Sequence, residues 1–281
     1  MRIREPAPAK INLFLRLLRL RDDGYHEVES LLQPVTLADG VEVSLSSGLS
    51  LVVVGSGAGS IPRGDDNLML RAAKALAAHA GVEPNARLLL AKNVPVAGGL
   101  GGGSADAAAA LRALNDLWGC GASLEDLMAL AADLGMDVPA LVHGGPVVVR
   151  GRGDVVEPIE IPRTWWVLVP LDLRVATADA YAWWDEDGGP TGPDPRPIID
   201  ALSRGEAAAA APLLYNDLEG PVIARHPQVG RAKERLLSFG VLAAVMSGSG
   251  PTVAGLCDGP RQAEQLAVET GGLVAASIHP R

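Results

Sequence analysis

A glycine-rich stretch near the middle of the chain carries the strongest chemical signal in the sequence. Five of the six positions from 98 to 103 are glycine, between a strand-like run over 87–91 and an alanine-rich helical run over 104–118. Glycine admits positive φ angles, which let successive backbone N–H groups converge. Ser104 opens the helix, as its N-cap or in its first turn, and a helix start offers unpaired N–H donors with partial positive charge. The stretch predicts an anion site, and a nucleotide phosphate fits it best.

Two familiar phosphate loops do not match this stretch. It lacks the Gly-Lys-Ser/Thr ending of a P-loop. The spacing Gly99-x-Gly101-x-x-Ser104 nearly fits the dinucleotide fingerprint and follows a strand. However, Pro95 and Gly98 lengthen the turn, and the stretch lies about ninety residues into the chain. A glycine-rich loop can also be a flexible connector, although the order strand, glycines, serine, helix argues against that alternative.

A strand near the N-terminus places two polar residues on one face. Residues 10–17 alternate, so that Ile11, Leu13, Leu15 and Leu17 point one way and Lys10, Asn12, Phe14 and Arg16 the other. The ordinary interpretation of Lys10 is an exposed strand lysine. The polar turn over 21–26 follows, and it offers the ring of Tyr25 for stacking and the backbone and imidazole of His26.

Asp137 precedes Val138-Pro139, the pattern of a helix N-cap with proline in the first turn. Capping would suffice to explain this aspartate. A role in chemistry is compatible with it, since one carboxylate oxygen can cap while the other faces a ligand.

Composition and charge exclude several classes of protein. The chain has 281 residues, 48% of them hydrophobic, and a net charge of −9. This charge, without a basic stretch, argues against a nucleic-acid partner, so an anionic substrate must be met by local donors. Cys120 and Cys257 form no disulfide framework or metal-ligand spacing, which fits a reducing cytoplasm. The apolar run over 11–20 is broken by two arginines, so we expect neither a signal peptide nor a membrane span.

The remaining pattern predicts an α+β protein. Over 41–45 and 49–54 we expect a hairpin, followed by a helix over 67–80 that Asp65 or Asp66 caps and Gly81 closes. A capped helix begins at Ser123 and another at Thr177, and a mobile loop covers 185–197. Further strands are expected over 147–150, 155–161, 165–170, 241–246, 252–257 and 273–278, and further helices over 198–202, 206–215, 228–238 and 261–270.

Four short motifs, in order along the chain, resemble those of the GHMP kinases (galactose, homoserine, mevalonate and phosphomevalonate kinases). Pro95 to Ala105 resembles the ATP loop of that family, and Met246 to Thr252 its third motif. Pro8 to Leu13, followed by Asp23 to His26, is similar to the members that act on a cytidine-diphosphate-linked methylerythritol. The matches run from residue 8 to about residue 255, and four motifs in order are much more specific than one.

The resemblance implies a fold and a reaction. The fold would be a two-domain GHMP kinase fold, with a ribosomal-protein-S5-like ATP domain over 1–157, a ferredoxin-like α+β domain over 158–281 and the active site in the cleft between them. The reaction would be ATP-dependent phosphorylation of the 2-hydroxyl of the methylerythritol in the non-mevalonate route to isoprenoids, with Mg²⁺ neutralising phosphate charge. Asp137 would accept the hydroxyl proton, and Lys10 would stabilise the developing alkoxide.

The resemblance also implies the binding residues. For ATP these are Asn67, Lys92, Pro95, Val96, Ala97, Gly98, Gly99, Leu100, Gly101, Gly102, Gly103, Ser104 and Ala105; for the acceptor they are Asn12, Tyr25, His26, Thr177, Tyr181, Gly248 and Ser249. Tyr25 and Tyr181 would sandwich the base. The chain departs from the family at Ala105, where a second serine is usual, so no hydroxyl role remains there. Asn67 can instead be an ordinary first-turn residue and Lys92 an ordinary strand-end lysine.

The sequence allows more than one interpretation of Asp106, of the acceptor and of the oligomeric state. Asp106 either assists Mg²⁺ through water or favours the helix N-terminus, and no side chain is assigned as a metal ligand. Another GHMP kinase with a homoserine or mevalonate-type acceptor is one alternative. A non-catalytic nucleotide-binding relative is another, although the presence of both Lys10 and Asp137 argues against it. A homodimer is possible.

Overall fold

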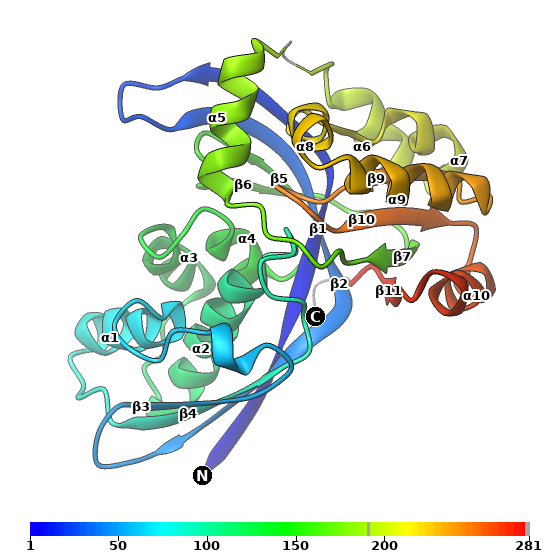
Figure 1. Cartoon of the computed structure of the whole chain (residues 1–281). Helices are drawn as coiled ribbons and strands as arrows, with labels where there is room; N and C mark the ends of the chain where they lie inside the picture. The colour runs from blue at the N-terminus through cyan, green and yellow to red at the C-terminus, as the bar shows by residue number, and fades with distance from the viewer. Residues whose placement is uncertain (190–191, 279–281) are drawn as a thin grey trace. The chain divides into compact units, whose positions relative to one another are not determined.

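The computed structural model describes residues 1–189 and 192–278 (Figure 1). The chain divides into two compact units, each built from separate stretches. The first unit comprises residues 1–9, 38–96 and 101–144, and the second comprises residues 10–37, 97–100 and 145–281. Strands β1 (Arg2–Leu20) and β2 (His26–Leu45) pass through both. The predicted α+β class is confirmed, and the domain boundary at 157/158 stays a prediction.

In the first unit, β4 (Ala86–Lys92) lies between β2 and β3 (Ser50–Gly55). It pairs antiparallel with Gly40–Leu45 of β2 and parallel with β3. The hairpin predicted over 41–54 is therefore wrong, although both strands exist. Alternating hydrophobicity marks a strand but does not identify its neighbour, and here a strand from later in the chain takes the place between them.

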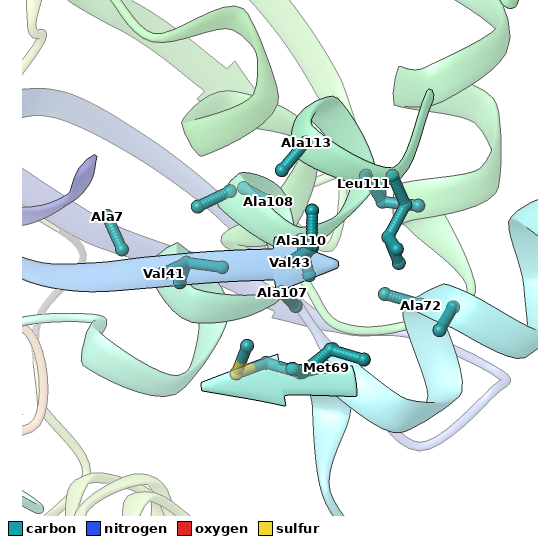
Figure 2. Packing of buried hydrophobic residues seen from close by; sticks show 14 of the residues in the cluster. Ala7, Val41, Val43, Met69, Ala72, Ala107, Ala108, Ala110, Leu111 and Ala113 are labelled. Atoms are coloured by element: carbon teal, nitrogen blue, oxygen red, sulfur yellow. The ribbon is translucent and has the colours of Figure 1, made fainter. Parts of the chain in front are cut away.

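Four helices and a short 3-10 turn, η1 (Ala58–Ser60), complete the first unit: α1 (Leu68–Ala80), α2 (Gly102–Trp118), α3 (Leu124–Ala132) and α4 (Val138–His143). Figure 2 shows the alanines of α2 gathered with Val41 and Val43 of β2 and with Met69 and Ala72 of α1. Ala107, Ala108, Ala109 and Ala110 are fully buried. Alanine favours the helix and has a minimal side chain, so α2 packs closely against its neighbours.

The helix ends of this unit agree only partly with the sequence predictions. Asn67, not Asp65 or Asp66, caps α1, because its side chain accepts a hydrogen bond from the N–H of Met69 at 2.9 Å. Asp65 instead pairs with Lys74. Gly81 closes α1 with a φ of 68°, as predicted. Ser123 and Asp126 form a capping box at α3, which confirms that prediction.

The second unit contains a four-stranded antiparallel sheet in the order β11-β7-β10-β9. Its strands are β7 (Trp165–Val169), β9 (Ala243–Met246), β10 (Val253–Cys257) and β11 (Leu273–Ala276). Helices α9 (Pro227–Ser238) and α10 (Pro260–Thr270) pack on it through Val229, Leu236, Ala263 and Leu266. The strand–turn–strand predicted over 241–257 is confirmed, with β9 and β10 as its arms.

The rest of the second unit surrounds the middle parts of β1 and β2. Strand β5 (Val147–Arg150) has its predicted bounds, and β6 (Val155–Pro158) ends three residues before the predicted end. The two form a hairpin, in which β5 also pairs with β2. The two-residue β8 (Tyr215–Asn216) runs parallel to β1 beside Phe14 and Leu15. Helices α5 (Thr177–Asp187), α6 (Arg196–Ser203), α7 (Ala207–Ala210) and α8 (Glu219–Arg225), and the 3-10 turn η2 (Ala211–Leu213), complete it.

Three predictions for this unit need correction. The helix expected over 206–215 ends after α7, since a 3-10 turn with Pro212 as its second residue follows and Tyr215 belongs to a strand. Helix α8 was not predicted. Thr177 is the first residue of α5 rather than its cap, which is Ala176. The loop expected over 185–197 is shorter, because α5 continues to Asp187 and α6 begins at Arg196; Pro190 and Thr191 lie outside the described residues.

Within the described part of the chain, no helix is both long and apolar enough to cross a membrane.

Candidate active site

Lys10 is a buried lysine, not the exposed strand residue of the ordinary interpretation. Its side chain is on β1, and the residue is only 4% exposed. The ammonium Nζ donates to Oδ1 of Asn12 at 2.6 Å and to the carbonyl of Gly99 at 3.1 Å, while the backbone N–H of Lys10 donates to the carbonyl of Leu100. The prediction that Lys10 and Asn12 share a face is confirmed.

The side chain of Asn12 is fixed by the second strand. Its Nδ2 donates to Oγ of Ser30 at 2.8 Å, and that hydroxyl donates in turn to the carbonyl of Phe14. This arrangement leaves the amide oxygen of Asn12 directed to Lys10. Burying an ammonium is costly unless oxygen atoms replace its water, and Asn12 supplies one of them.

The turn over 247–252 joins the same network. Oγ of Ser247 donates to the carbonyl of Gly99 at 3.0 Å, and the N–H of Thr252 donates to the carbonyl of Gly98. A Cβ on Gly248 would stand 3.0 Å from Nζ of Lys10, and Gly248 has a φ of 54°. Glycine at this position therefore lets the chain approach the ammonium closely. Lys10, the loop over 98–100 and the third motif form one site in the second unit.

The polar segment over 216–219 was missed by the sequence reasoning. Asp217 accepts hydrogen bonds from the N–H of Leu17 and the hydroxyl of Tyr215, both at 2.7 Å. Asn216 and Glu219 hold the strand that leads into the 247–252 turn. Three acid or amide side chains within four positions, next to an alanine-rich run, were the available signal, but their partners lie far away in the sequence.

In the first unit, α2 begins two residues before the predicted start at Ser104, so of the two alternatives for Ser104 the first-turn position is confirmed. Gly101 occupies the N-cap position with a φ of 67° and no capping side chain, so the helix starts at Gly102 and Ser104 lies in its first turn. The N–H groups of Gly102, Gly103 and Ser104 precede the first helical hydrogen bond, which runs from the N–H of Ala105 to the carbonyl of Gly101. Ser104 is half-buried and Ala105 is buried.

Lys92 ends β4, as predicted, but its ammonium is held by two carboxylates. Nζ pairs with Asp39 and, at 3.1 Å, with Asp106 of α2. The second oxygen of Asp39 accepts the N–H groups of Asn93 at 2.6 Å and Val94 at 2.8 Å. These buried groups connect the residues that enter the glycine-rich loop with the helix that leaves it. Asp39 was not predicted, since more than fifty positions separate it from Lys92.

Asp106 carries a strongly perturbed carboxyl. Burial raises its pKa to about 7, Lys92 opposes the rise, and the neighbouring charge of Asp39 adds to it. Its Oδ1 is buried and has no hydrogen-bond partner among the described residues. With two carboxylates sharing one ammonium, Asp106 is the group that takes up a proton.

Asp137 stands at the start of α4, directly before Val138 and Pro139, as the sequence predicts. The prediction that its side chain caps the helix is wrong, because no such hydrogen bond is present. The residue has helical angles, φ −84° and ψ −14°, whereas a capping residue usually has extended angles that turn its side chain over the first N–H groups. Asp137 is half-buried, and its backbone carbonyl accepts the N–H of Leu141.

The aromatic residues predicted to hold a base are partly gathered. His26 is buried, its Nε2 lies 2.8 Å from Oδ1 of Asp185, and its ring centroid lies 5.4 Å from that of Tyr181. Trp184 contacts the same imidazole edge-on at 5.7 Å. Tyr25 is 48% exposed, with the guanidinium of Arg152 over its ring. The sandwich of a base between Tyr25 and Tyr181 stays a prediction.

The remaining predicted residues have structural contacts of their own. Oγ1 of Thr177 lies 3.2 Å from Oγ of Ser249, which brings these two predicted acceptor ligands together. Asn67, besides capping α1, donates to the carbonyl of Pro62. Its contact with adenine and the contact of residues 95–103 with ATP stay predictions.

Comparisons of this chain with family models, with known relatives and with solved structures agree on one family. The family model "GHMP kinases N terminal domain" matches residues 67–145, and "GHMP kinases C terminal" matches residues 198–269. The 4-diphosphocytidyl-2-C-methyl-D-erythritol kinase of Pelotomaculum thermopropionicum is 43% identical over 98% of both chains. The kinase of that name from Salinispora arenicola is 43% identical over 95% of this chain and 87% of its own. A crystal structure of 4-(cytidine 5'-diphospho)-2C-methyl-D-erythritol kinase superposes with a TM-score of 0.83, at 37% identity and 98% coverage of each chain.

The raised pKa of Asp106 predicts a pH dependence of stability that Asp106→Asn removes. The folded protein holds a proton that the unfolded chain, with a carboxyl pKa of 3.8, releases. This proton favours folding at low pH, and its contribution is lost as the pH rises through about 7. The free energy of unfolding of the variant, minus that of the wild type, should therefore increase with pH, by at most about 1.4 kcal/mol per unit.

Urea denaturation of both proteins between about pH 5 and about pH 8 measures this difference. Loss of the Lys92 contact adds a constant offset, which does not affect the slope. Asp126→Asn is the control, since hydrogen bonds with Ser123 lower the pKa of Asp126 and place its titration below this window. A flat difference for Asp106→Asn would show that the buried carboxyl stays ionised.

Proposed function

The chain belongs to the GHMP kinase family, and from this premise we propose that it phosphorylates the 2-hydroxyl of 4-diphosphocytidyl-2-C-methyl-D-erythritol with ATP. The observation that carries the proposal is the identity of 43% over 98% of both chains with a relative of that name. The site supports it, because the network of Lys10, Gly99 and Ser247 joins three of the four motifs noted in the sequence.

The start of α2 is the proposed site for the ATP phosphates. The N–H groups of Gly102, Gly103 and Ser104 are not used within the first helical turn, and they carry the partial positive charge of the helix. The buried group of Asp39, Lys92 and Asp106 holds both ends of the loop. We therefore assign Lys92 the role of positioning the loop, in addition to the nucleotide contact that the family resemblance implies.

Magnesium would arrive with the nucleotide. Residues 1–189 and 192–278 contain no cluster of three or more acidic, histidine or cysteine side chains that could hold a metal ion. Mg²⁺ keeps several waters and binds readily to substrate phosphates, so it does not need a cage of protein ligands. Its contribution would be to neutralise phosphate charge.

Lys10 and Asp137 are the proposed catalytic residues. Phosphoryl transfer depends on positioning and charge stabilisation more than on covalent chemistry. The ammonium of Lys10 donates to the amide oxygen of Asn12 and to the carbonyl of Gly99, and these bonds hold its positive charge at a defined point. Asp137, whose carboxylate does not cap α4, would accept the proton of the acceptor hydroxyl.

We also propose a cytoplasmic location. Cys120 and Cys257 are both free thiols, as expected for a protein in a reducing compartment. A homodimer stays a prediction.

A coupled ADP-release assay with a panel of acceptors tests the proposal. A site that binds the cytidylyl group should reject acceptors that lack it by about 10⁴-fold in kcat/KM. Homoserine and mevalonate are the comparison acceptors. Faster turnover of either would assign the chain to another branch of the family, and ATP binding without turnover of any acceptor would indicate a non-catalytic relative.

Asp137→Asn should fold normally and bind ATP, because asparagine is nearly the same size as aspartate and tolerates the same backbone angles. Without the proton acceptor, kcat should fall about 10²–10⁴-fold, or roughly 3–5 kcal/mol in activation free energy. Lys10→Met should also lower kcat, and the double variant should be much less than additively worse if the two residues act as a unit.

Asp133→Asn is the matched control, because Asp133 is an exposed aspartate with similar helical angles at the end of α3. It should keep wild-type kcat, ATP affinity and melting temperature. The general-base role of Asp137 fails if Asp137→Asn retains more than about a tenth of wild-type kcat while chemistry is rate-limiting.

Tyr181→Ala and Tyr25→Ala should each weaken acceptor binding by roughly 1–3 kcal/mol, if these rings stack on the cytosine. ATP affinity should hardly change. Tyr181→Phe keeps the ring and its contact with His26, so it should bind the acceptor almost normally. Isothermal titration calorimetry with ATP and with the acceptor measures both affinities. If the alanine variants weaken the binding of both ligands equally, a folding defect explains the loss instead of stacking.

A further inference from the structure

Asn216 is a buried amide, 6% exposed, that makes three hydrogen bonds. Its Nδ2 donates to the carbonyls of Met246 and Gly248, each at 2.7 Å, and its Oδ1 accepts the N–H of Leu218 at 2.9 Å. Both N–H donors of the amide are therefore used on one turn of the chain. Nothing in the reaction proposed above uses this residue.

The bond to Gly248 determines where the next N–H points. A trans peptide is planar, and its C=O and N–H point in opposite directions. Since the carbonyl of Gly248 faces Asn216, the N–H of Ser249, in the same peptide unit, points to the opposite side. The backbone hydrogen bonds of this turn within the described residues use the N–H groups of Ser247, Gly250 and Thr252. None of them uses the N–H of Ser249.

Glu219 strengthens the arrangement from the same segment. Its Oε2 accepts the N–H of Met246 at 2.7 Å, and its Oε1 pairs with Lys233. Asn216 donates to the carbonyl of Met246, so both the N–H and the C=O of Met246 are hydrogen-bonded to side chains of this segment. The turn therefore leaves β9 in one defined orientation.

The neighbours of Ser249 suit a phosphate oxygen. The backbone of Gly248 lies against the ammonium of Lys10, and Oγ of Ser249 lies 3.2 Å from the hydroxyl of Thr177. Thr177 begins α5, and Tyr181 follows one helical turn, or about 6 Å, later on the same face. A nucleotide with its base beside Tyr181 and His26 would have its phosphates near Ser249.

We propose that Asn216 is a positioning residue: by binding the carbonyl of Gly248, it holds the N–H of Ser249 as a donor to a phosphate oxygen of the acceptor's nucleoside diphosphate. The inference rests on the proposed function, since it needs an acceptor that carries a diphosphate. The proposed site thereby gains a preorganised donor, the backbone N–H of Ser249, which is oriented by a side chain that does not itself touch the substrate.

Asn216→Asp tests the inference with almost no change in size. A carboxylate cannot donate to the two carbonyls and repels them, so the peptide between Gly248 and Ser249 loses its fixed orientation. Calorimetric titration of the full chain with CDP, cytidine and ATP measures the result. We expect CDP affinity to fall about tenfold to a hundredfold, as for a lost hydrogen bond to a charged group. Cytidine and ATP affinities should change by less than about twofold.

Gln33→Glu is the matched control. Gln33 is a fully buried amide in the same unit, and its Nε2 likewise donates to two carbonyls, those of Pro34 at 2.8 Å and Ile278 at 3.1 Å. This variant should lose a comparable amount of thermal stability and keep wild-type CDP affinity. If both variants weaken CDP equally, or if Asn216→Asp weakens CDP and cytidine alike, Asn216 has only a general structural role and the inference is overturned.

A second variant and a second measurement cover the case in which Asn216→Asp does not fold. Asn216→Ala leaves room for water at the two carbonyls and should show the same selective loss of CDP affinity. In wild-type protein, the ¹⁵N–¹H signal of Ser249 should shift on addition of CDP and not of cytidine.

Three outcomes contradict the proposals. If the Asn216 variants weaken ATP binding and leave CDP binding unchanged, the N–H of Ser249 serves ATP and not the acceptor, and the inference is overturned. Wild-type protein that binds no CDP would overturn the proposed acceptor as well, whereas unchanged CDP affinity in the variants would overturn this inference alone.

Discussion

A buried ammonium needs oxygen atoms in place of its lost water, and the arrangement around Lys10 follows from that requirement. The carbonyl of Gly99 is one such oxygen, so the glycine-rich segment over 98–100 must lie against β1. Ser247 donates to the same carbonyl, which fixes the third motif beside it. The amide of Asn12 supplies another oxygen, and it is held by Ser30 of the neighbouring strand. Three motifs that are far apart in sequence thus meet around one charge.

The second buried lysine, Lys92, lies between two carboxylates, those of Asp39 and Asp106. Its positive charge therefore keeps a negative partner even when Asp106 is protonated. Removing one member of such a group leaves a buried charge without its partner, which typically costs about 3–5 kcal/mol. Lys92 is therefore well suited to holding the loop in shape.

The sequence predicts features that depend on local chain chemistry, and it fails where a partner comes from far away. Alternation revealed β1 and the shared face of Lys10 and Asn12, and the glycine–serine order revealed the start of α2. The capping box of Ser123 was equally local. Asp39 and Asn216 could not be found this way, because their partners are more than thirty positions away or are backbone groups. The hairpin over 41–54 failed for the same reason, since β4, which separates its strands, comes later in the chain.

An acidic protein that binds two polyanionic nucleotides has to do so with short-range donors. The net charge of −9 repels both substrates at a distance, but at physiological salt that repulsion is screened beyond about 8 Å. Backbone N–H groups at the start of α2 and at Ser249 supply partial positive charge without a counterion to be displaced. Their usefulness depends on a fixed orientation, and each is fixed by a buried polar group: the cluster of Asp39, Lys92 and Asp106 in one unit, and the amide of Asn216 in the other. In the proposed site, these two buried polar groups would act on the substrates indirectly, through the backbone that they hold in place.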